Sequence, residues 1–93
     1  MNDAEALEVL RPRLANFRND PYGSLVSRIK AEPIAETVEV GAVTYYLKFL
    51  FVWDDRRGGN VRVIGNVDDG GICAYHPLSD SFIKGPDEGF VGE

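Results

Sequence analysis

One histidine and a few neighbouring polar residues are the part of this chain whose types could support catalysis. His76 precedes Ser79 and Asp80, so a histidine, a serine and an acid lie within one short segment. A carboxylate beside a histidine can tune the imidazole as a general base. The segment lacks the Gly-x-Ser-x-Gly turn that exposes a nucleophilic serine, and no helix N-terminus is expected nearby to bind an oxyanion. A turn histidine among ordinary turn-forming residues is therefore the favoured interpretation.

A second polar group directly follows the most apolar segment of the chain and consists of Asp54, Asp55, Arg56 and Arg57. In a meander of antiparallel strands, this group lies at the same end of the sheet as His76 and Asp80. Asp68 and Asp69 lie at the opposite end, ~23 Å away at ~3.3 Å per residue. The first end is thus a candidate polar edge. This edge is the basis of one alternative hypothesis for the function. In that hypothesis the chain is a small enzyme or ligand-binding domain with its site at Asp54, Asp55, His76 and Asp80.

No cofactor and no metal is expected. Structural zinc needs clustered Cys and His, whereas this chain has one of each, Cys73 and His76. Cys73 is expected to behave as a small buried residue. The Gly58-Gly59 and Gly70-Gly71 pairs are expected to join strand to strand, so no helix dipole faces a phosphate there.

A nucleic-acid-binding sheet is a further alternative, because basic and aromatic residues alternate in one region. The basic residues are Arg56, Arg57 and Arg62, and the aromatic ones are Tyr45, Tyr46, Phe49 and Trp53. These arginines lie among aspartates, and most of these aromatic side chains fall on the expected core face. Nucleic acid is therefore an unfavoured partner.

The elements that must position these residues begin with two helices. Apolar residues spaced at i, i+3, i+7 and i+10 predict a helix near 4–19, namely Leu7, Leu10, Leu14 and Phe17. Asn2 and Glu5 have the spacing of a capping box, and Pro12 predicts a kink or a break. After the turn-forming residues 19–23, Ser24 is expected to cap a short second helix that ends before Pro33.

From Glu36 onward the pattern has a period of two residues and predicts hairpins. Strands are expected at about 37–40, 43–53, 61–67 and 72–76, with a short edge segment at 78–84. Gly41 as the first loop residue predicts a type II′ turn. The order of the elements predicts one α+β domain over residues 1–93, with the helices on one face of a four- to five-stranded antiparallel meander.

The strand at 43–53 is unusual because both of its faces carry apolar residues. The odd positions, Val43, Tyr45, Leu47, Phe49, Phe51 and Trp53, form the face expected beneath the helices. On the reverse face, Tyr46, Leu50 and Val52, together with Ile64 of the next strand, need another cover. Two explanations stay open: the C-terminal segment with Phe82, Ile83, Phe90 and Val91 wraps across this face, or the face is an interface with a partner or a second copy.

Composition and charge favour an interaction domain over an enzyme. The chain has 93 residues, 44% of them hydrophobic and 27% charged, and a net charge of −5 from 15 acidic and 10 basic residues. A chain of this size forms one core without a deep catalytic cavity. The leading hypothesis is a non-catalytic protein-interaction domain, such as a small acidic inhibitor or immunity-type protein that binds a basic partner, with a homodimer as the other association. The single cysteine and the absence of a secretory or membrane-spanning pattern suggest a cytoplasmic protein.

Overall fold

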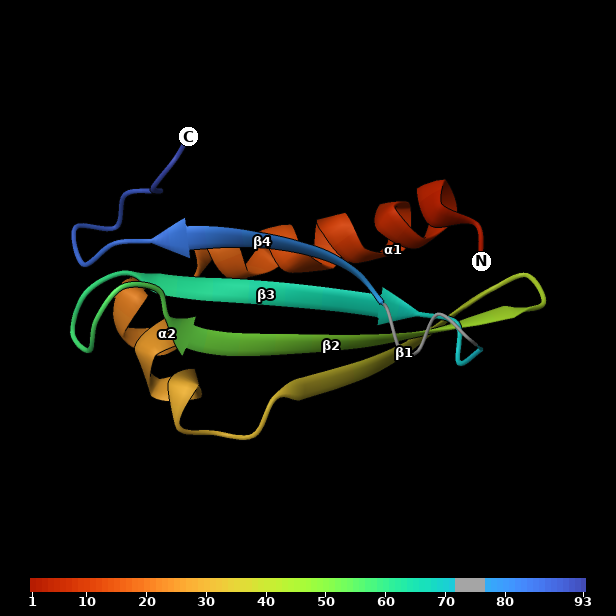
Figure 1. The fold of residues 1–93 in the computed structure, drawn as a ribbon, viewed down its shortest axis with the longest axis horizontal. Coiled ribbons are helices and arrows are strands. Elements are labelled where there is room, and N and C mark those ends of the chain that lie inside the picture. Colours follow the sequence, from red (N-terminus) through yellow and green to blue (C-terminus); the bar gives the residue numbers. More distant parts are fainter. Residues whose placement is uncertain (72–76) are drawn as a thin grey trace.

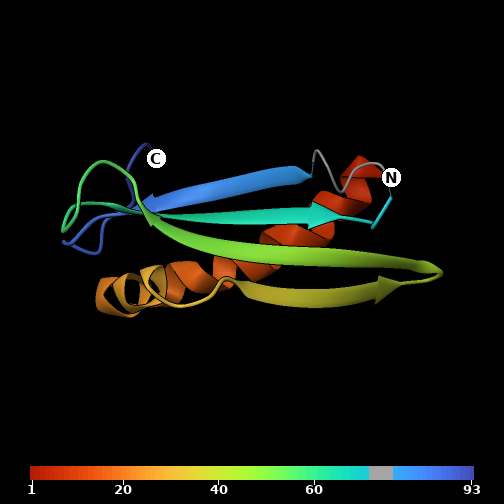
Figure 2. The same cartoon turned by 60° about the horizontal axis from the view of Figure 1, so that its bottom comes forward.

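The computed structural model describes residues 1–71 and 77–93 and has the predicted α+β fold. Among these residues, two helices pack on one face of a four-stranded antiparallel sheet with the order β1-β2-β3-β4 (Figures 1 and 2). The elements are α1 (Asp3–Asn16), the 3-10 turn η1 (Phe17–Asn19), α2 (Tyr22–Ile29), β1 (Ile34–Val40), β2 (Val43–Trp53), β3 (Val61–Asp68) and β4 (Leu78–Lys84). The short edge segment expected at 78–84 is β4. The strand expected at 72–76 lies outside the described residues.

Helix α1 begins at the predicted cap and passes through its proline. The Asn2 side chain accepts a hydrogen bond from the Glu5 amide at 3.1 Å. The helix continues through Pro12 to Asn16 without a break. A proline at position 12 removes the N–H that would bond the Glu8 carbonyl. The Arg13 side chain donates to a different carbonyl, that of Val9, at 2.9 Å. Leu10 and Leu14, on either side of Pro12, are buried against the sheet, and this packing offsets the missing bond.

Helix α2 begins at Tyr22, so the expectation that Ser24 caps it is wrong. Ser24 lies inside the helix, and its carbonyl accepts a hydrogen bond from the Ser27 hydroxyl. The carboxylate of Glu88 accepts hydrogen bonds from the Tyr22 amide at 2.9 and 3.1 Å and so acts as the cap. Glu88 lies 66 positions from Tyr22 in the sequence. Local sequence rules consider only nearby residues, and they therefore placed the start of this helix incorrectly.

The first hairpin follows its predicted geometry. Val40 pairs with Val43 across the loop Gly41-Ala42. Gly41 has φ of +60°, and Ala42 is not among the residues with positive φ. A positive φ at the first loop position only is the property of a type II′ turn.

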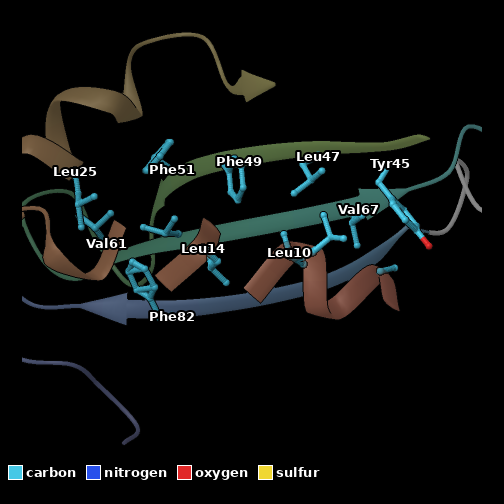
Figure 3. Packing of buried hydrophobic residues seen from close by; sticks show 13 residues of the cluster. Leu10, Leu14, Leu25, Tyr45, Leu47, Phe49, Phe51, Val61, Val67 and Phe82 are labelled. Atoms are coloured by element: carbon cyan, nitrogen blue, oxygen red, sulfur yellow. The ribbon is translucent and has the colours of Figure 1, made fainter. Parts of the chain in front are cut away.

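The core lies between the helices and the odd-numbered face of β2, as the alternation predicts (Figure 3). Tyr45, Leu47, Phe49 and Phe51 are buried, whereas Val43 at the tip of the hairpin is 38% exposed. Helix α1 approaches the sheet closely over a glycine. A Cβ at Gly65 would lie 2.8 Å from Cδ1 of Leu10.

The molecule is elongated, with extents of 42 × 24 × 18 Å. In the part of the chain that the structure describes, no helix combines the length and the apolar composition needed to cross a bilayer.

Candidate functional site

The face of the sheet opposite the helices, here called the open face, is built from cross-strand rows. Strand register places Leu50 beside Ile64 and Val52 beside Arg62. The next strand adds Ser81 to the first row and Ile83 to the second. Four apolar side chains therefore occupy two adjacent rows: Leu50, Val52, Ile64 and Ile83, here called the apolar patch. Sequence reasoning assigned Ile83 to a covering segment and missed it as a member of this surface.

The C-terminal segment does not cover the open face. Phe82 points to the helix side and is buried, and its ring lies 5.9 Å from that of Phe90. Phe90 forms an isolated bridge with Lys84 at the sheet edge. On the open face, Tyr46 is 48% and Val52 39% exposed. The wrapping explanation is therefore wrong for this face, because the C-terminal aromatic residues pack on the other side of β4.

Tyr46 lies apart from the apolar patch. The row that contains Lys48, Asn66 and Ser79 separates it from Leu50. Tyr46 is paired in register with Asp68. These two residues, with Lys48 and Asn66, line a shallow hollow of about 360 Å³ on the open face. Of the four interface candidates, Leu50, Val52 and Ile64 thus belong to the apolar patch, and Tyr46 belongs to an adjoining hollow with a mixed lining.

The predicted polar edge is only partly assembled. Asp54 accepts a hydrogen bond from Nε of Arg62 at 2.9 Å and pairs with its Nη2 at 2.8 Å. Asp55 orders the loop after β2 by accepting from the amides of Arg56 and Asn60. The Arg56 amide, with the Asn60 amide in support, holds the pKa of Asp55 below its usual value. Among the described residues, Arg56 and Arg57 form no ion pair.

Asp80 lies elsewhere, so its predicted place beside Asp54 is wrong. Residues 78–84 form β4, which runs antiparallel to β3 and places Asp80 opposite Gly65 in mid-sheet. Its carboxylate lies 3.3 Å from Nε of Arg11 on α1. The expected meander had its fourth strand at 72–76, and this choice placed Asp80 beyond the strand end. His76 and Cys73 lie outside the described residues, so the structure does not test a histidine site.

The aromatic residues of the nucleic-acid hypothesis do not share one accessible surface. Tyr45 and Phe49 are buried on the helix side, and Tyr46 alone faces the open side. Arg62 is engaged by Asp54. In the described ranges 1–71 and 77–93, no three His, Cys, Asp or Glu side chains cluster closely enough to hold a metal ion.

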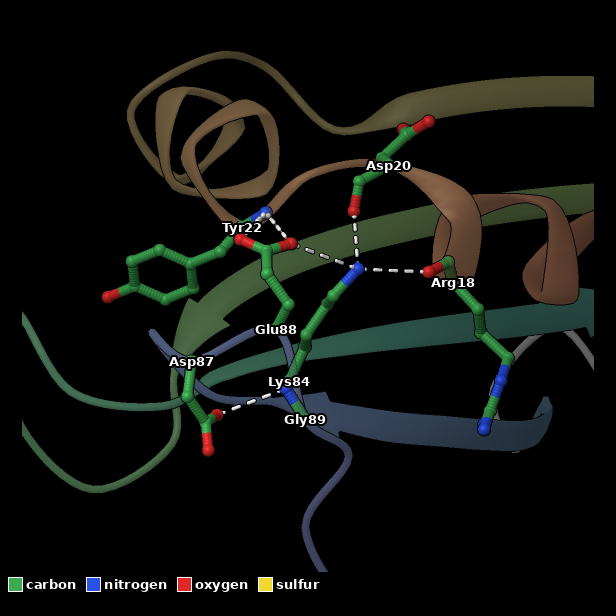
Figure 4. Close-up of polar contacts among 7 residues, drawn as sticks. All are labelled: Arg18, Asp20, Tyr22, Lys84, Asp87, Glu88 and Gly89. Atoms are coloured by element: carbon green, nitrogen blue, oxygen red, sulfur yellow. Dashed lines mark hydrogen bonds and ion pairs between the residues drawn. The ribbon is translucent and has the colours of Figure 1, made fainter.

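A buried lysine joins the C-terminal turn to the helix junction (Figure 4). Lys84 is 5% exposed, and its Nζ donates to the carbonyls of Arg18 at 3.0 Å and Asp20 at 2.7 Å. Glu88 lies 3.4 Å from the same nitrogen and also caps α2. Sequence reasoning missed this cluster. The sequence does contain a pattern that indicates it. Lys84 lies two positions after Phe82, and side chains two positions apart on a strand face the same side, so a buried Phe82 places Lys84 on the helix side as well.

The net charge is concentrated in one half of the elongated molecule. The half with the α1 N-terminus and the first hairpin comprises residues 1–16, 34–49, 65–71 and 77–80. It carries eight acidic side chains against three basic ones, and the remaining described residues carry seven of each. The acidic side chains are Asp3, Glu5, Glu8, Glu36, Glu39, Asp68, Asp69 and Asp80, and the basic ones Arg11, Arg13 and Lys48. The hollow beside Tyr46 belongs to this acidic half.

Comparison of the chain with protein-family models, curated proteins and solved structures found no match. The geometry of the described residues is therefore the basis for any functional interpretation.

Proposed function

We propose that this chain is a non-catalytic protein-binding domain whose open face receives a basic protein partner. The observation that carries the proposal is an apolar patch that no described residue covers, beside a hollow in the acidic half that contains Tyr46 and Asp68. Apolar surface that the described residues leave exposed is typical of a binding surface. A partner that buried this patch would gain the hydrophobic stabilisation that the fold leaves unused.

The hollow supplies the polar part of the contact. A lysine or arginine of the partner that enters it meets the carboxylate of Asp68 and the exposed ring of Tyr46. Carboxylates and aromatic faces both attract such cations. Lys48 at the rim disfavours a second cation beside it, so the hollow suits one basic side chain flanked by apolar residues that reach Leu50 and Ile64.

The uneven charge supports steering of this partner. A field from one acidic end attracts a basic protein over about a Debye length, ~8–10 Å at physiological salt, and orients it toward the hollow. The narrower form of the proposal is a small inhibitor or immunity-type protein that blocks a basic protein such as a nuclease, in the cytoplasm. A small acidic protein gains association rate in this role.

The test is capture on immobilised protein followed by direct titration of the purified captured protein. The wild-type chain is compared with Leu50→Lys, and Ala15→Lys on exposed α1 surface is the control with the same charge change. We expect a captured protein that is basic, binds the wild type and the control equally, and loses at least tenfold in affinity for Leu50→Lys, roughly 1.4 kcal/mol or more.

Two results would contradict the proposal. One is a captured protein that binds all three variants alike, because the open face is then not involved. The other is a wild-type homodimer in sedimentation that Leu50→Lys dissociates, because the occupant is then a second copy. Circular dichroism of each variant verifies that the fold is retained.

A further inference from the structure

Strand β2 extends beyond its neighbour and leaves part of one edge unpaired. Its register with β1 ends at the pair formed by Phe49 and Ile34. Its register with β3 continues to Trp53. Among the described residues, 50–53 are therefore paired on the β3 side only, although they lie within a regular strand.

The backbone groups on this free edge can be assigned. The Asp54 amide donates to the Asn60 carbonyl at 2.8 Å, on the β3 side. Backbone groups alternate in direction along an antiparallel strand, so those of Phe51 and Trp53 point away from β3. Within the described part of the chain, these amides and carbonyls have no hydrogen-bond partner. Such an edge is a template for one more strand.

A groove of about 270 Å³ runs along this edge. One wall is formed by Leu50, Phe51 and Val52 of β2, and the other by the end of α2 and the turn after it, with Arg28, Ile29, Ala31 and Pro33. The free backbone groups of Phe51 therefore border this groove.

Arg28 supplies a charged group to this groove. Its guanidinium carbon lies 5.8 and 5.7 Å from the ring centroids of Phe17 and Phe51. No ion pair of the described residues involves it, whereas Arg11, Arg13, Arg18 and Arg62 each have a carboxylate partner. The groove therefore combines free backbone groups, apolar walls and one cation without a carboxylate among the described residues.

We infer that this groove binds a short extended peptide as an added strand beside Phe51 and Trp53, with an acidic side chain of the peptide at Arg28. The peptide lies beside residues 50–53 of β2, in the strand position next to β2 that β1 does not fill because its pairing ends at Ile34. Its main chain pairs with the free edge, and its apolar side chains pack between Ile29 and Val52. A carboxylate is the group that an arginine fork binds best. Leu50 and Val52 line this groove and also belong to the apolar patch, but the inference rests on the free backbone edge and on Arg28, which the proposal for the basic partner does not use.

The experiment uses two amidated probes, acetyl-Val-Thr-Val-Glu-Val-Thr and its counterpart with glutamine in place of glutamate. Each is titrated into isotope-labelled full-length protein, and the backbone amides are followed by NMR. We expect the largest shifts, and slower hydrogen exchange, at the amides of Phe51 and Trp53. The glutamate probe should bind about fivefold to tenfold more tightly than the glutamine probe, as expected for one charge-assisted contact.

Variants of Arg28 test the assigned contact. Arg28→Gln should lower the affinity for the glutamate probe to that of the glutamine probe and leave the glutamine probe unaffected. Arg28→Lys should retain part of the preference, and Arg57→Gln, on the loop outside the groove, should retain all of it. A melting curve for each variant verifies the fold, and Arg28→Lys serves as the test variant if Arg28→Gln unfolds.

Three results would overturn the inference. They are shifts centred on the outer edge of β1 or β4, equal binding of both probes to the wild type, and no binding of either probe at millimolar concentration. The two proposals are distinguished by Arg28→Gln and not by Leu50→Lys, because Leu50 belongs to both surfaces. The basic partner proposed for the open face should bind Arg28→Gln as it binds the wild type.

Discussion

The Tyr45 hydroxyl donates a hydrogen bond to Oε1 of Glu5, with 2.6 Å between the two oxygens. Tyr45 comes from the sheet and Glu5 from the first turn of α1, 40 positions apart. The bond fixes the N-terminal end of the helix over β2. Glu5 also donates its amide to the Asn2 cap, so one residue joins the helix start to the sheet.

This bond predicts a change in stability at high pH. The hydrogen bond to the Glu5 carboxylate, burial of the ring and the Glu5 charge together raise the pKa of Tyr45 from 10.0 to about 12. A raised pKa means that the stabilisation is complete below pH ~10, where the unfolded phenol is still protonated, and that it is lost as the pH rises toward about 12. We expect Tyr45→Phe to unfold at a urea concentration that depends less on pH in this window.

Absorbance of tyrosinate provides a direct measurement. One of the four tyrosines should ionise near pH 12, and this step should be absent from Tyr45→Phe. Glu5→Gln should move it toward the ordinary value, because the negative acceptor is removed. A wild-type titration without an ionisation step near pH 12 would contradict the assigned bond.

The buried ammonium of Lys84 should contribute strongly to stability. Lys84→Met retains most of the stem packing but leaves the carbonyls of Arg18 and Asp20 without their donor. We expect a loss of about 2–4 kcal/mol in urea unfolding, since each buried unsatisfied group costs ~1–3 kcal/mol. Arg57→Met on the exposed loop is the control and should change stability by less than ~0.5 kcal/mol. A similar small loss for Lys84→Met would show that water replaces the ammonium.

An added methyl group should destabilise the protein at Gly65 and stabilise it at Gly23. A Cβ at Gly65 meets Leu10 at 2.8 Å and the Phe49 ring at 3.2 Å. Gly65→Ala should therefore cost about 1–3 kcal/mol by overpacking. Gly23 lies within α2, and a Cβ added there would have no neighbouring atom within 4 Å, so Gly23→Ala should stabilise the protein by about 0.5–1 kcal/mol. Thermal unfolding of the two variants should move in opposite directions, and equal shifts would contradict the packing of α1 on β3.

Phe49 tests which face of β2 forms the core. Its side chain is fully buried, and Phe49→Ala should cost roughly 3–5 kcal/mol by leaving a cavity. Tyr46→Ala, on the open face, should cost far less. Urea unfolding of both variants decides the point, and a loss under ~1 kcal/mol for Phe49→Ala would mean that the faces are reversed.

The location of the charge, and not its total, should control association with a basic partner. Glu8→Gln with Glu39→Gln removes two acidic groups from the acidic half, and Asp20→Asn with Glu32→Gln removes two from the neutral half. Both double variants move the net charge from −5 to −3. We expect the first pair to slow association and weaken its salt dependence more than the second pair, measured by stopped-flow mixing with the purified partner. Equal effects would leave steering by the acidic end without support.

The alternation of residues 43–53 determined the boundaries of β2 and its buried face, because side chains on a strand alternate between two environments. Gly41 likewise determined the type of the first turn, because glycine readily adopts the positive φ that the first loop position requires. Asn2 and Glu5 determined where α1 begins, since their bond spans only three positions. In each case the physical cause lies within a few neighbouring residues and can be read from the sequence.

Contacts between distant residues decided the rest. Glu88 caps α2 and Lys84 reaches the carbonyls of Arg18 and Asp20 because the C-terminal turn folds against the helix junction. Asp80 lies in mid-sheet and not at the expected edge because the pairing partner of β3 is 78–84. The free edge of β2 exists because β1 begins opposite Phe49. Strand pairing and packing depend on the energy of the whole chain, so local periodicity identifies the elements but not which distant groups they bring together.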